Sequence, residues 1–228
     1  MRDRDWERIG AATGAISALL FIIGFGIFPT PPDVDAPATE IHSYFADEQS
    51  GIQAALVVLT GALFFFIWFL GSLRSALRVA EGGTGRVSSI AFAGGMVSAS
   101  ALFVLITLIA GAAFHPDEST PEVTLALNDL AVVSGAPALA GLTALFAASA
   151  KVAFRHGAFS QPIAWLLALA ALAQPFAVGA MLTDSGAFAG DGALGLFLPI
   201  LAFSVAVLAI SGALVQRAGR SGPGEVPQ

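Results

Sequence analysis

The side chains best suited to polar chemistry lie in the connectors between apolar stretches of the chain. Two histidines each stand close to carboxylates in the sequence, and imidazole combined with carboxylate suits zinc or manganese. If the connectors converge in space, these groups form one metal site. Its candidate ligands are His42, Glu40, Asp47, His115 and Asp117. The alternative interpretation is that these groups are solvated charge on an external face of the protein.

A second candidate is Gln174, a polar side chain that falls within an apolar stretch and directly precedes Pro175. A proline inside a helix frees a carbonyl group one turn earlier and commonly kinks the helix. In one interpretation, Gln174 and Pro175 contact a ligand or line a pore. In the other, the Gln174 amide makes an interhelical hydrogen bond that contributes roughly 1 kcal/mol.

Other motifs that carry chemistry are missing from the sequence. The run from Gly82 to Arg86 lacks the Gly-Lys-Ser/Thr ending and the preceding strand of a P-loop, so it predicts a turn. The absence of cysteine excludes thiol catalysis and thiolate metal sites. No ionisable residue falls in the middle of an apolar stretch, whereas ion-coupled transport, intramembrane haem sites and membrane proteases need such groups. The sequence therefore predicts no catalytic residue and no cofactor, and it disfavours an enzyme.

The elements that must position these groups are long apolar stretches. The 228 residues are 56% hydrophobic and 11% charged, against roughly 25% charged residues in soluble domains. A membrane-spanning helix needs ~20 apolar residues, and six stretches meet this length. They cover residues 8–28, 52–73, 87–114, 130–150, 162–182 and 192–215. The first is longer than the apolar region of a signal peptide, so we expect a retained helix.

The connectors between these stretches alternate in charge. All ten Lys and Arg residues lie in the N-terminus, the second and fourth connectors and the C-terminal tail. Most of the sixteen Asp and Glu residues lie in the first, third and fifth connectors. The positive-inside rule then predicts that both termini are cytoplasmic. Trp6, Trp68 and Trp165 fall near the predicted cytoplasmic ends, where interfacial aromatic residues are expected.

The fold predicted from this pattern is all-α: a polytopic membrane protein built as an antiparallel bundle of six transmembrane helices in three hairpins. It forms a single domain over residues 1–220, followed by a disordered cytoplasmic tail over residues 221–228. We expect the helices to pack through pairs of small residues, Gly10 with Gly14 and Gly94 with Ser98. Further points of close approach are expected at Gly24, Gly26, Gly61, Gly135, Gly141 and Gly195.

Two connectors are predicted to contain helix of their own. Ile41, Tyr44 and Phe45 share one face at helical spacing, which predicts a short amphipathic helix at the outer surface before the second span. On the cytoplasmic side, we expect the second span to continue as helix through Arg78. Glycine is common just past the end of a helix, so Gly82 is expected to terminate it.

Four short motifs lie in order along most of the chain. They are Tyr44-Phe45-Ala46-Asp47, Trp68-Phe69-Leu70-Gly71-Ser72-Leu73-Arg74, Ala80-Glu81-Gly82-Gly83 and Leu125-Ala126-Leu127-Asn128-Asp129-Leu130. In these motifs the chain resembles a family of uncharacterised bacterial six-span membrane proteins. The resemblance implies the six-span topology and a bacterial origin, and it implies no activity and no functional residue.

The sequence thus predicts a multi-pass protein of the bacterial plasma membrane with both termini in the cytoplasm. Its expected partners are membrane lipids and either a protein partner or further copies of itself, and nucleic acid is excluded by the net charge of −6. The leading functional hypothesis is non-catalytic binding of a lipid-like or apolar ligand or of partner proteins. The alternatives are a transporter or channel for an uncharged or apolar solute, and a membrane enzyme with an external His/carboxylate metal site.

Overall fold

The computed structural model describes residues 3–33, 35–176 and 198–220, with side chains for all of these except residues 3–8 and 220. Every regular element in this part of the chain is helical, which confirms the predicted all-α class. The elements are α1 (Asp3–Ile27), α2 (Ala38–Asp47), α3 (Gln49–Glu81), α4 (Arg86–Ala112), the 3-10 helix η1 (Pro116–Glu118), α5 (Pro121–His156), α6 (Gln161–Ala173) and α7 (Leu198–Arg220).

Five of the described helices are long and apolar enough to cross a membrane. The qualifying segments are Ile9–Ile27 in α1, Gln49–Glu81, Arg86–Ala112, Pro121–His156 and Leu198–Gly219 in α7. The fifth predicted span, residues 162–182, begins as the shorter apolar helix Gln161–Phe176. The rest of that span, the start of the sixth span and the predicted tail over 221–228 lie outside the described residues. The 13 residues of α6 rise ~20 Å, less than a hydrocarbon core of ~30 Å.

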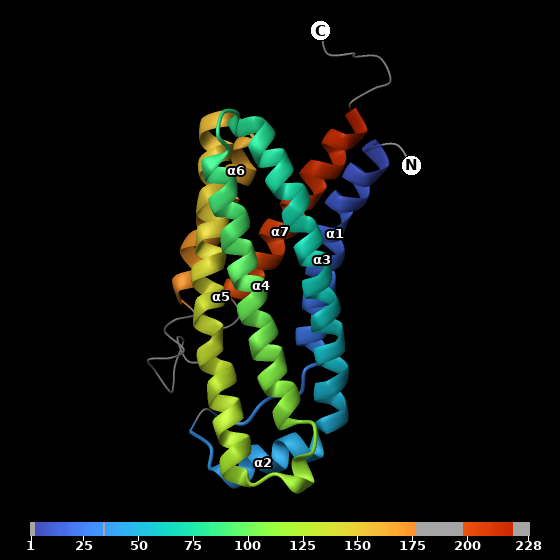
Figure 1. The fold of residues 1–228 in the computed structure, drawn as a ribbon, viewed down its shortest axis with the longest axis vertical. Helices are drawn as coiled ribbons and strands as arrows, with labels where there is room; N and C mark the ends of the chain where they lie inside the picture. Colours follow the sequence, from blue (N-terminus) through green and yellow to red (C-terminus); the bar gives the residue numbers. More distant parts are fainter. Residues whose placement is uncertain (1–2, 34, 177–197, 221–228) are drawn as a thin grey trace.

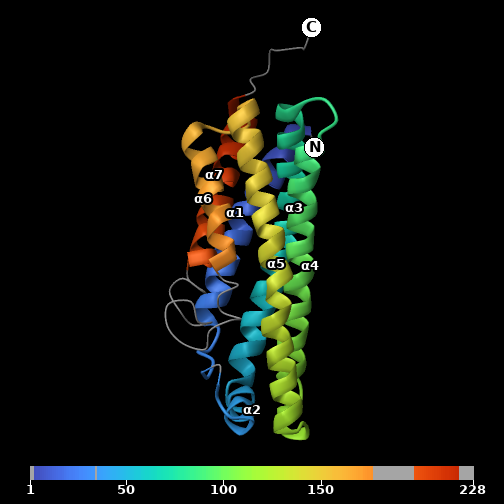
Figure 2. The ribbon, with the colours of Figure 1, turned by 90° about the vertical axis from the view of Figure 1, so that its left-hand side faces the viewer.

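The helices other than α2 and η1 form a closed ring. Around it α1 packs on α3, α3 on α4, α4 on α5, α5 on α6, α6 on α7, and α7 returns to α1. Figures 1 and 2 show α4 and α5 running side by side along the length of the bundle. In Figure 1, α6 and α7 lie toward the end at which α1 begins, and α2 lies at the opposite end. In this ring each long helix packs on the next one along the chain, which is the usual arrangement of consecutive elements.

The predicted amphipathic helix is present as α2, which lies across one end of the bundle (Figure 1). Its apolar face buries Ile41 and Phe45 in one cluster with Ile52 of α3, Ile109 of α4 and Ala131 of α5. Each of these side chains is at most 9% exposed. Because α2 packs on α3, α5 and η1, it covers this end of the bundle.

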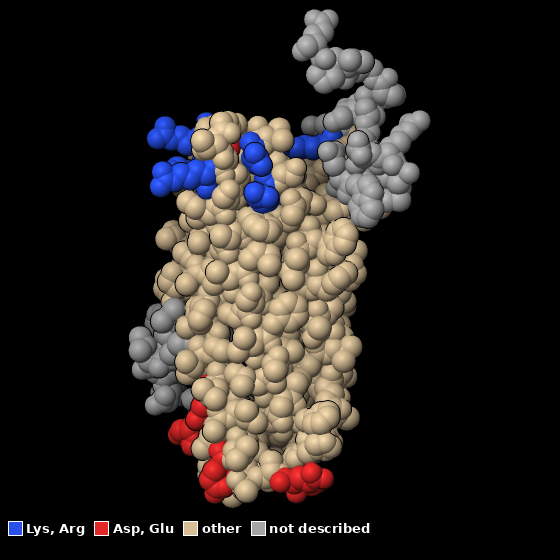
Figure 3. Space-filling model, viewed as in Figure 1, with Lys and Arg blue, Asp and Glu red and all other residues tan. Residues whose placement is uncertain are grey.

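Charged side chains gather at the two ends of the bundle, and the face shown in Figure 3 has no Lys, Arg, Asp or Glu along its middle. The end with the α3–α4 and α5–α6 connectors, called the basic end below, carries exposed Lys and Arg residues. Those with described side chains are Arg74, Arg78, Arg86, Lys151, Arg155 and Arg217. The end with α2 and η1, called the acidic end, carries Glu40, Asp47, Asp117 and Glu122 among others. Trp68 and Trp165 are 46% and 59% exposed, and the side chain of Trp6 lies outside the described residues.

The backbones of α4 and α5 approach each other closely at Gly94 and Gly141. A Cβ atom at Gly94 would lie 2.6 Å from the carbonyl oxygen of Gly141 and 2.9 Å from the amide nitrogen of Leu145. The Ser98 hydroxyl donates to the carbonyl oxygen of Ala138 at 2.7 Å across the same contact. The predicted role of Gly94 and Ser98 is therefore confirmed, since small side chains let the two backbones touch.

The pair Gly10 and Gly14 has the same role between α1 and α3. A Cβ at Gly10 would collide with the Ser72 hydroxyl, and one at Gly14 would collide with the Phe69 ring. Gly24 and Gly141 are also close-approach points, as expected. The prediction was wrong for Gly26, where nothing lies within 4 Å, and Gly61 and Gly135 have only an ordinary contact at 3.9 Å. Gly195 lies outside the described residues.

The turn between α3 and α4 confirms the predicted end of α3. The helix runs through Arg78 to Glu81, and Gly82 and Gly83 follow with φ of 65° and 56°, a conformation that favours glycine. The Glu81 carboxylate then accepts the backbone N–H groups of Val87 and Ser88, both at 2.8 Å. Glu81 thus satisfies two free donors at the start of α4.

The α4–α5 contact predicts a position-specific cost of adding one methyl group. We expect Gly141→Ala to lower the free energy of unfolding by ~1–3 kcal/mol, because the new Cβ meets the backbone of α4 and not a flexible side chain. Denaturant unfolding in detergent micelles, followed by circular dichroism, measures this change.

The matched control is Gly26→Ala, where the new Cβ meets nothing within 4 Å. It should change stability by less than ~1 kcal/mol, since removing a flexible glycine from a helix is neutral or mildly stabilising. Equal destabilisation by the two variants would contradict the assigned close contact.

Candidate functional site

The polar side chains buried in the described part of the bundle are all uncharged. They are Thr13, Ser17, Ser88, Ser98, Thr124, Ser149, Gln174, Ser204 and Ser211. No described Asp, Glu, Lys, Arg or His side chain is among them. Since proton relays and ion-coupling sites rely on buried ionisable groups, chemistry inside the described part of the bundle is restricted to hydrogen bonding.

Gln174 lies at the end of α6, where the α-helix passes into a 3-10 turn that contains Pro175. Its side chain is fully buried, whereas Pro175 is exposed. The amide Nε2 donates to the carbonyl oxygens of Ala170, at 3.2 Å, and of Pro199 in α7, at 3.4 Å. The interhelical hydrogen bond of the second sequence interpretation is therefore present, and it joins α6 to α7.

Two buried oxygen atoms near the start of α7 have unused hydrogen-bonding capacity. Gln174 Oε1 and Ser204 Oγ have no hydrogen-bond partner among the described residues. A buried polar atom without a partner typically costs ~1–3 kcal/mol. Gln174 and Ser204 are therefore the two buried side chains in the described part of the bundle whose oxygen atoms remain available to a further hydrogen-bond donor.

Two other buried hydroxyl groups, those of Ser17 and Ser211, join α1 to its neighbours in the ring. Ser17 of α1 donates to the carbonyl oxygen of Ala62 in α3 at 2.9 Å. Ser211 of α7 donates to the carbonyl oxygen of Ala11 and accepts the N–H of Ala15 at 3.0 Å. The Ser211 hydroxyl thus bonds both the carbonyl oxygen of Ala11 and the N–H of Ala15, and these two bonds hold α7 against α1.

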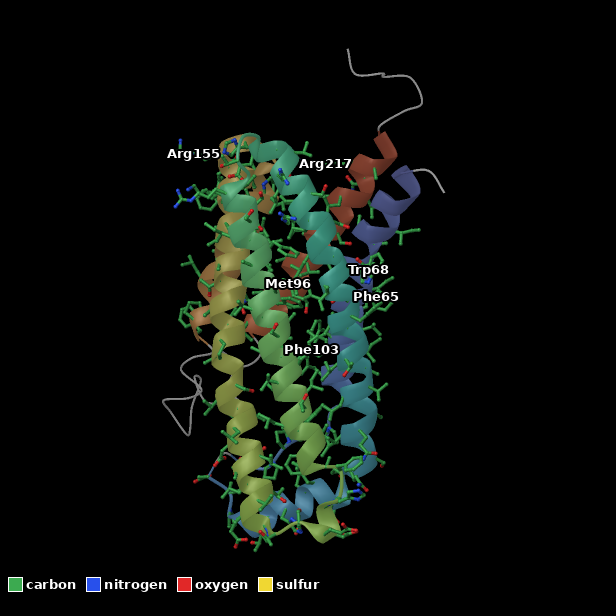
Figure 4. All side chains as sticks on the ribbon, in the orientation of Figure 1. Phe65, Trp68, Met96, Phe103, Arg155 and Arg217 are labelled. Carbon is green, nitrogen blue, oxygen red and sulfur yellow. The ribbon has the colours of Figure 1, made fainter. Side chains whose placement is uncertain are left out.

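Aromatic side chains fill the middle of the bundle. The ring of Phe203 in α7 meets Phe21 of α1 at 5.2 Å, Phe66 of α3 at 5.4 Å and Phe146 of α5 at 6.3 Å between centroids. All four side chains are at most 7% exposed. Met96 and Phe103 of α4, labelled in Figure 4, are partly buried and pack against the same hydrophobic core. At this depth, aromatic side chains from α1, α3, α5 and α7 therefore fill the space between these helices.

A polar network holds α2 to the start of α5 at the acidic end. His42 Nδ1 lies 3.1 Å from the Thr124 hydroxyl, and that hydroxyl lies 3.0 Å from the hydroxyl of Ser119. Thr124 is fully buried and also contacts the carbonyl oxygen of Thr120 at 3.3 Å. These bonds give His42 a structural partner, so it anchors α2.

The residues predicted to bind a metal are not assembled into a site. Within the described residues, no three His, Asp or Glu side chains are placed to hold one metal ion. His42 pairs with Thr124, and His115 packs its ring against Phe114 at 4.3 Å. Glu40 and Asp47 belong to α2, and Asp117 belongs to η1. The arrangement favours the alternative interpretation, in which the carboxylates are solvated charge.

Tyr44 fixes the connector that precedes α2. Its hydroxyl donates to the carbonyl oxygen of Pro29 at 2.9 Å. Burial, and to a lesser extent the nearby Glu48 carboxylate, raises the pKa of Tyr44 to about 12. The phenol therefore stays protonated and remains a hydrogen-bond donor throughout the physiological range.

The glycine run at the basic end is a turn, as predicted, and it does not present a phosphate cradle. The two N–H groups that a phosphate would approach at the start of α4, those of Val87 and Ser88, already bind Glu81. The role of Glu81 was not predicted from the sequence, because a carboxylate six residues before its partner has no local signature. Ser204, Ser211 and Phe203 were missed for a related reason: nothing in an apolar stretch shows which side faces inward.

Comparison with known proteins adds no relative to this description. No protein-family model matches the chain, and no curated protein or solved structure is significantly similar to it. The resemblance to uncharacterised bacterial six-span proteins therefore stays a prediction, and function must be argued from the geometry.

The unused oxygen of Gln174 leads to a prediction about stability. Gln174→Met keeps the length of the side chain and removes both the unpartnered Oε1 and two long hydrogen bonds. We expect the free energy of unfolding to stay within ~1 kcal/mol of the native value or to rise, since the removed desolvation cost offsets the lost bonds. Thermal unfolding in detergent measures this.

The control for this variant is Ser98→Ala, which removes a 2.7 Å bond between α4 and α5 without removing an unpartnered atom. It should be the more destabilising change. A clear loss of stability in Gln174→Met, larger than in Ser98→Ala, would show that Gln174 is retained for its contact with Pro199.

Proposed function

We propose that this chain is a bacterial plasma-membrane protein that crosses the bilayer six times with both termini in the cytoplasm. We further propose that it acts by binding lipid-like or apolar molecules, or partner proteins, without catalysis and without conducting a solute along its axis. The observation that carries the second statement is the aromatic closure around Phe203.

The distribution of charge supports the proposed orientation. The Lys and Arg residues with described side chains are exposed at one end, and the carboxylates of α2 and η1 are at the other (Figure 3). The positive-inside rule then favours a cytoplasmic basic end. Glu81 is the one described carboxylate side chain at the basic end, and it accepts hydrogen bonds from two backbone N–H groups.

An even number of crossings is supported by the positions of α1 and α7. The first turn of α1 and the last turn of α7 lie at the same end of the bundle (Figure 1). Arg217 near the end of α7 donates to the carbonyl oxygen of Gly157, at 3.4 Å, in the α5–α6 connector. Five crossings would separate the two termini, whereas six agree with the six apolar stretches of the sequence.

The closed interior supports binding over conduction. Four phenylalanine rings from α1, α3, α5 and α7 meet at the axis, and no described ionisable side chain is buried among the helices. A polar solute following the axis would have to displace packed aromatic rings, each pair of which contributes ~0.5–1.5 kcal/mol beyond its buried area. The exposed apolar faces and the two charged ends are then the surfaces available for recognition.

Transport of an uncharged solute is the second candidate, and one observation favours it. Gln174 Oε1 is a buried acceptor without a described partner, at the point where α6 stops being an α-helix. Transporters commonly bind substrate at breaks in helices near the middle of the membrane. A path beside the axis, past Gln174, would avoid the rings around Phe203.

The proposed topology can be tested with single cysteines, because the chain has none of its own. The positions Asp117, Ser160 and Gln216 are all exposed. A membrane-impermeant maleimide should label Asp117→Cys in intact cells, and it should label Ser160→Cys and Gln216→Cys only after lysis. Labelling of Gln216→Cys on the same side as Asp117→Cys would contradict six crossings.

A flux measurement separates binding from transport. Proteoliposomes should swell in glycerol or urea at the rate of protein-free liposomes, because the axis is closed. A protein-dependent increase that disappears in Gln174→Met and persists in Gln53→Met would overturn the proposal in favour of transport. Gln53 is a fair control since its amide bonds the carbonyl oxygen of Ala113 at 3.3 Å near the acidic end.

A further inference from the structure

Two exposed cations on α5 stand together at the basic end. Lys151 and Arg155 are four residues apart, which places them on one side of the helix, and both are exposed. Arg155 projects outward from the bundle in Figure 4. In the proposed membrane orientation, this end of α5 lies where lipid head groups meet the hydrocarbon core.

An exposed aromatic pair lies directly beside these cations. Phe154 of α5 and Trp165 of α6 meet edge to face, with centroids 5.0 Å apart and an interplanar angle of 75°. They are 40% and 59% exposed, so the pair joins the two helices on their outer surface. Lys151 and Trp165 are each about one turn from the ends of their helices, at matching depth, and tryptophan favours this interfacial level.

An apolar stripe continues from Trp165 along α6. Leu169 and Leu172 follow it at spacings of four and three residues and are 61% and 65% exposed. This spacing places all three side chains on one face of the helix. The stripe runs from the cations toward the middle of the bundle, in the direction an acyl chain takes below its phosphate.

Two other arginines at the basic end lie over aromatic rings of the protein itself. Arg74 lies over the ring of Phe92, and Arg217 lies over the ring of Phe159, each at 5.3 Å from the centroid. The described residues provide no comparable aromatic partner for Lys151 or Arg155. Because Glu81 is occupied by backbone N–H groups, it is a poor counter-ion for them.

We propose that the outer face of α5 and α6 binds one anionic phospholipid. Its phosphate accepts hydrogen bonds from Lys151 and Arg155, Trp165 lies at the boundary between head group and chain, and one acyl chain follows Leu169 and Leu172. This inference rests on the proposed membrane orientation and gives the binding function a defined class of ligand. Charge complementarity sets the preference for an anionic head group, and the exposed stripe supplies affinity for the chains.

The test is native mass spectrometry of the full-length protein in detergent, titrated with phosphatidylglycerol or phosphatidylcholine of identical chains. We expect the first phosphatidylglycerol to bind more tightly than phosphatidylcholine. Lys151→Gln with Arg155→Gln should weaken phosphatidylglycerol binding by ~10–30-fold, since each cation contributes electrostatically to anionic lipid binding, and should leave phosphatidylcholine unaffected. Trp165→Ala should weaken binding of both lipids.

The matched control is Arg74→Gln with Arg78→Gln, which removes the same charge, at the same spacing, from α3. It should change phosphatidylglycerol binding by less than ~3-fold, because it leaves Lys151 and Arg155 in place and the remaining effect of net charge is screened by salt. Glycerol phosphate at millimolar concentration should not compete, which distinguishes a lipid from a free phosphate ester. Unchanged thermal unfolding of each variant shows that the fold is kept.

Three results would overturn the lipid site: equal affinity for the two lipids, equal losses in the two double variants, or full competition by glycerol phosphate. None of these results would contradict the proposed topology, because the cysteine labelling tests it separately. Conversely, labelling of Ser160→Cys in intact cells would contradict the proposed orientation. The lipid preference measured by mass spectrometry in detergent does not depend on that result.

Discussion

The rest of this structure depends on one constraint, which is that backbone polar groups in hydrocarbon have no water to bind. The described chain meets it with helices, and its buried side chains then bond the backbone of neighbouring helices. Ser17, Ser98, Ser211 and Gln174 each donate to a carbonyl oxygen on another helix. These four bonds join α1 to α3, α4 to α5, α7 to α1 and α6 to α7, so they secure most of the ring.

Close packing of small residues also holds the helices together, in addition to these hydrogen bonds. Lipid tails are as apolar as leucine, so helices gain little from burying leucine against each other and gain more from dense contact of small residues. The backbones of α4 and α5 touch at Gly94 and Gly141, and the space left at the axis is filled by the ring of Phe203. The same packing that stabilises the bundle fills the space between α1, α3, α5 and α7 with aromatic rings, which is why we propose recognition at the outer surface.

The two ends of the bundle differ in more than the sign of their charge. The acidic end is covered by α2, where His42 bonds Thr124 and Tyr44 bonds the connector. At the basic end the connectors are short turns, and cations such as Arg155 extend outward (Figure 4). The surface that combines exposed cations with exposed aromatic and aliphatic side chains therefore belongs to the basic end.

The sequence by itself determined the helical class, the apolar lengths, the amphipathic helix α2, the end of α3 at Gly82 and the clustering of charge between spans. These features depend on local spacing and on composition. Only the tertiary structure decided that Gly141 meets a neighbouring backbone while Gly26 meets nothing, that His42 anchors a helix without joining a metal site, and that Ser211 bonds Ala11, 200 residues away. The physical reason is that these helices are apolar on every side, so their sequences do not show which face points inward. That face is set by packing against neighbouring helices, and those contacts join residues far apart in the sequence.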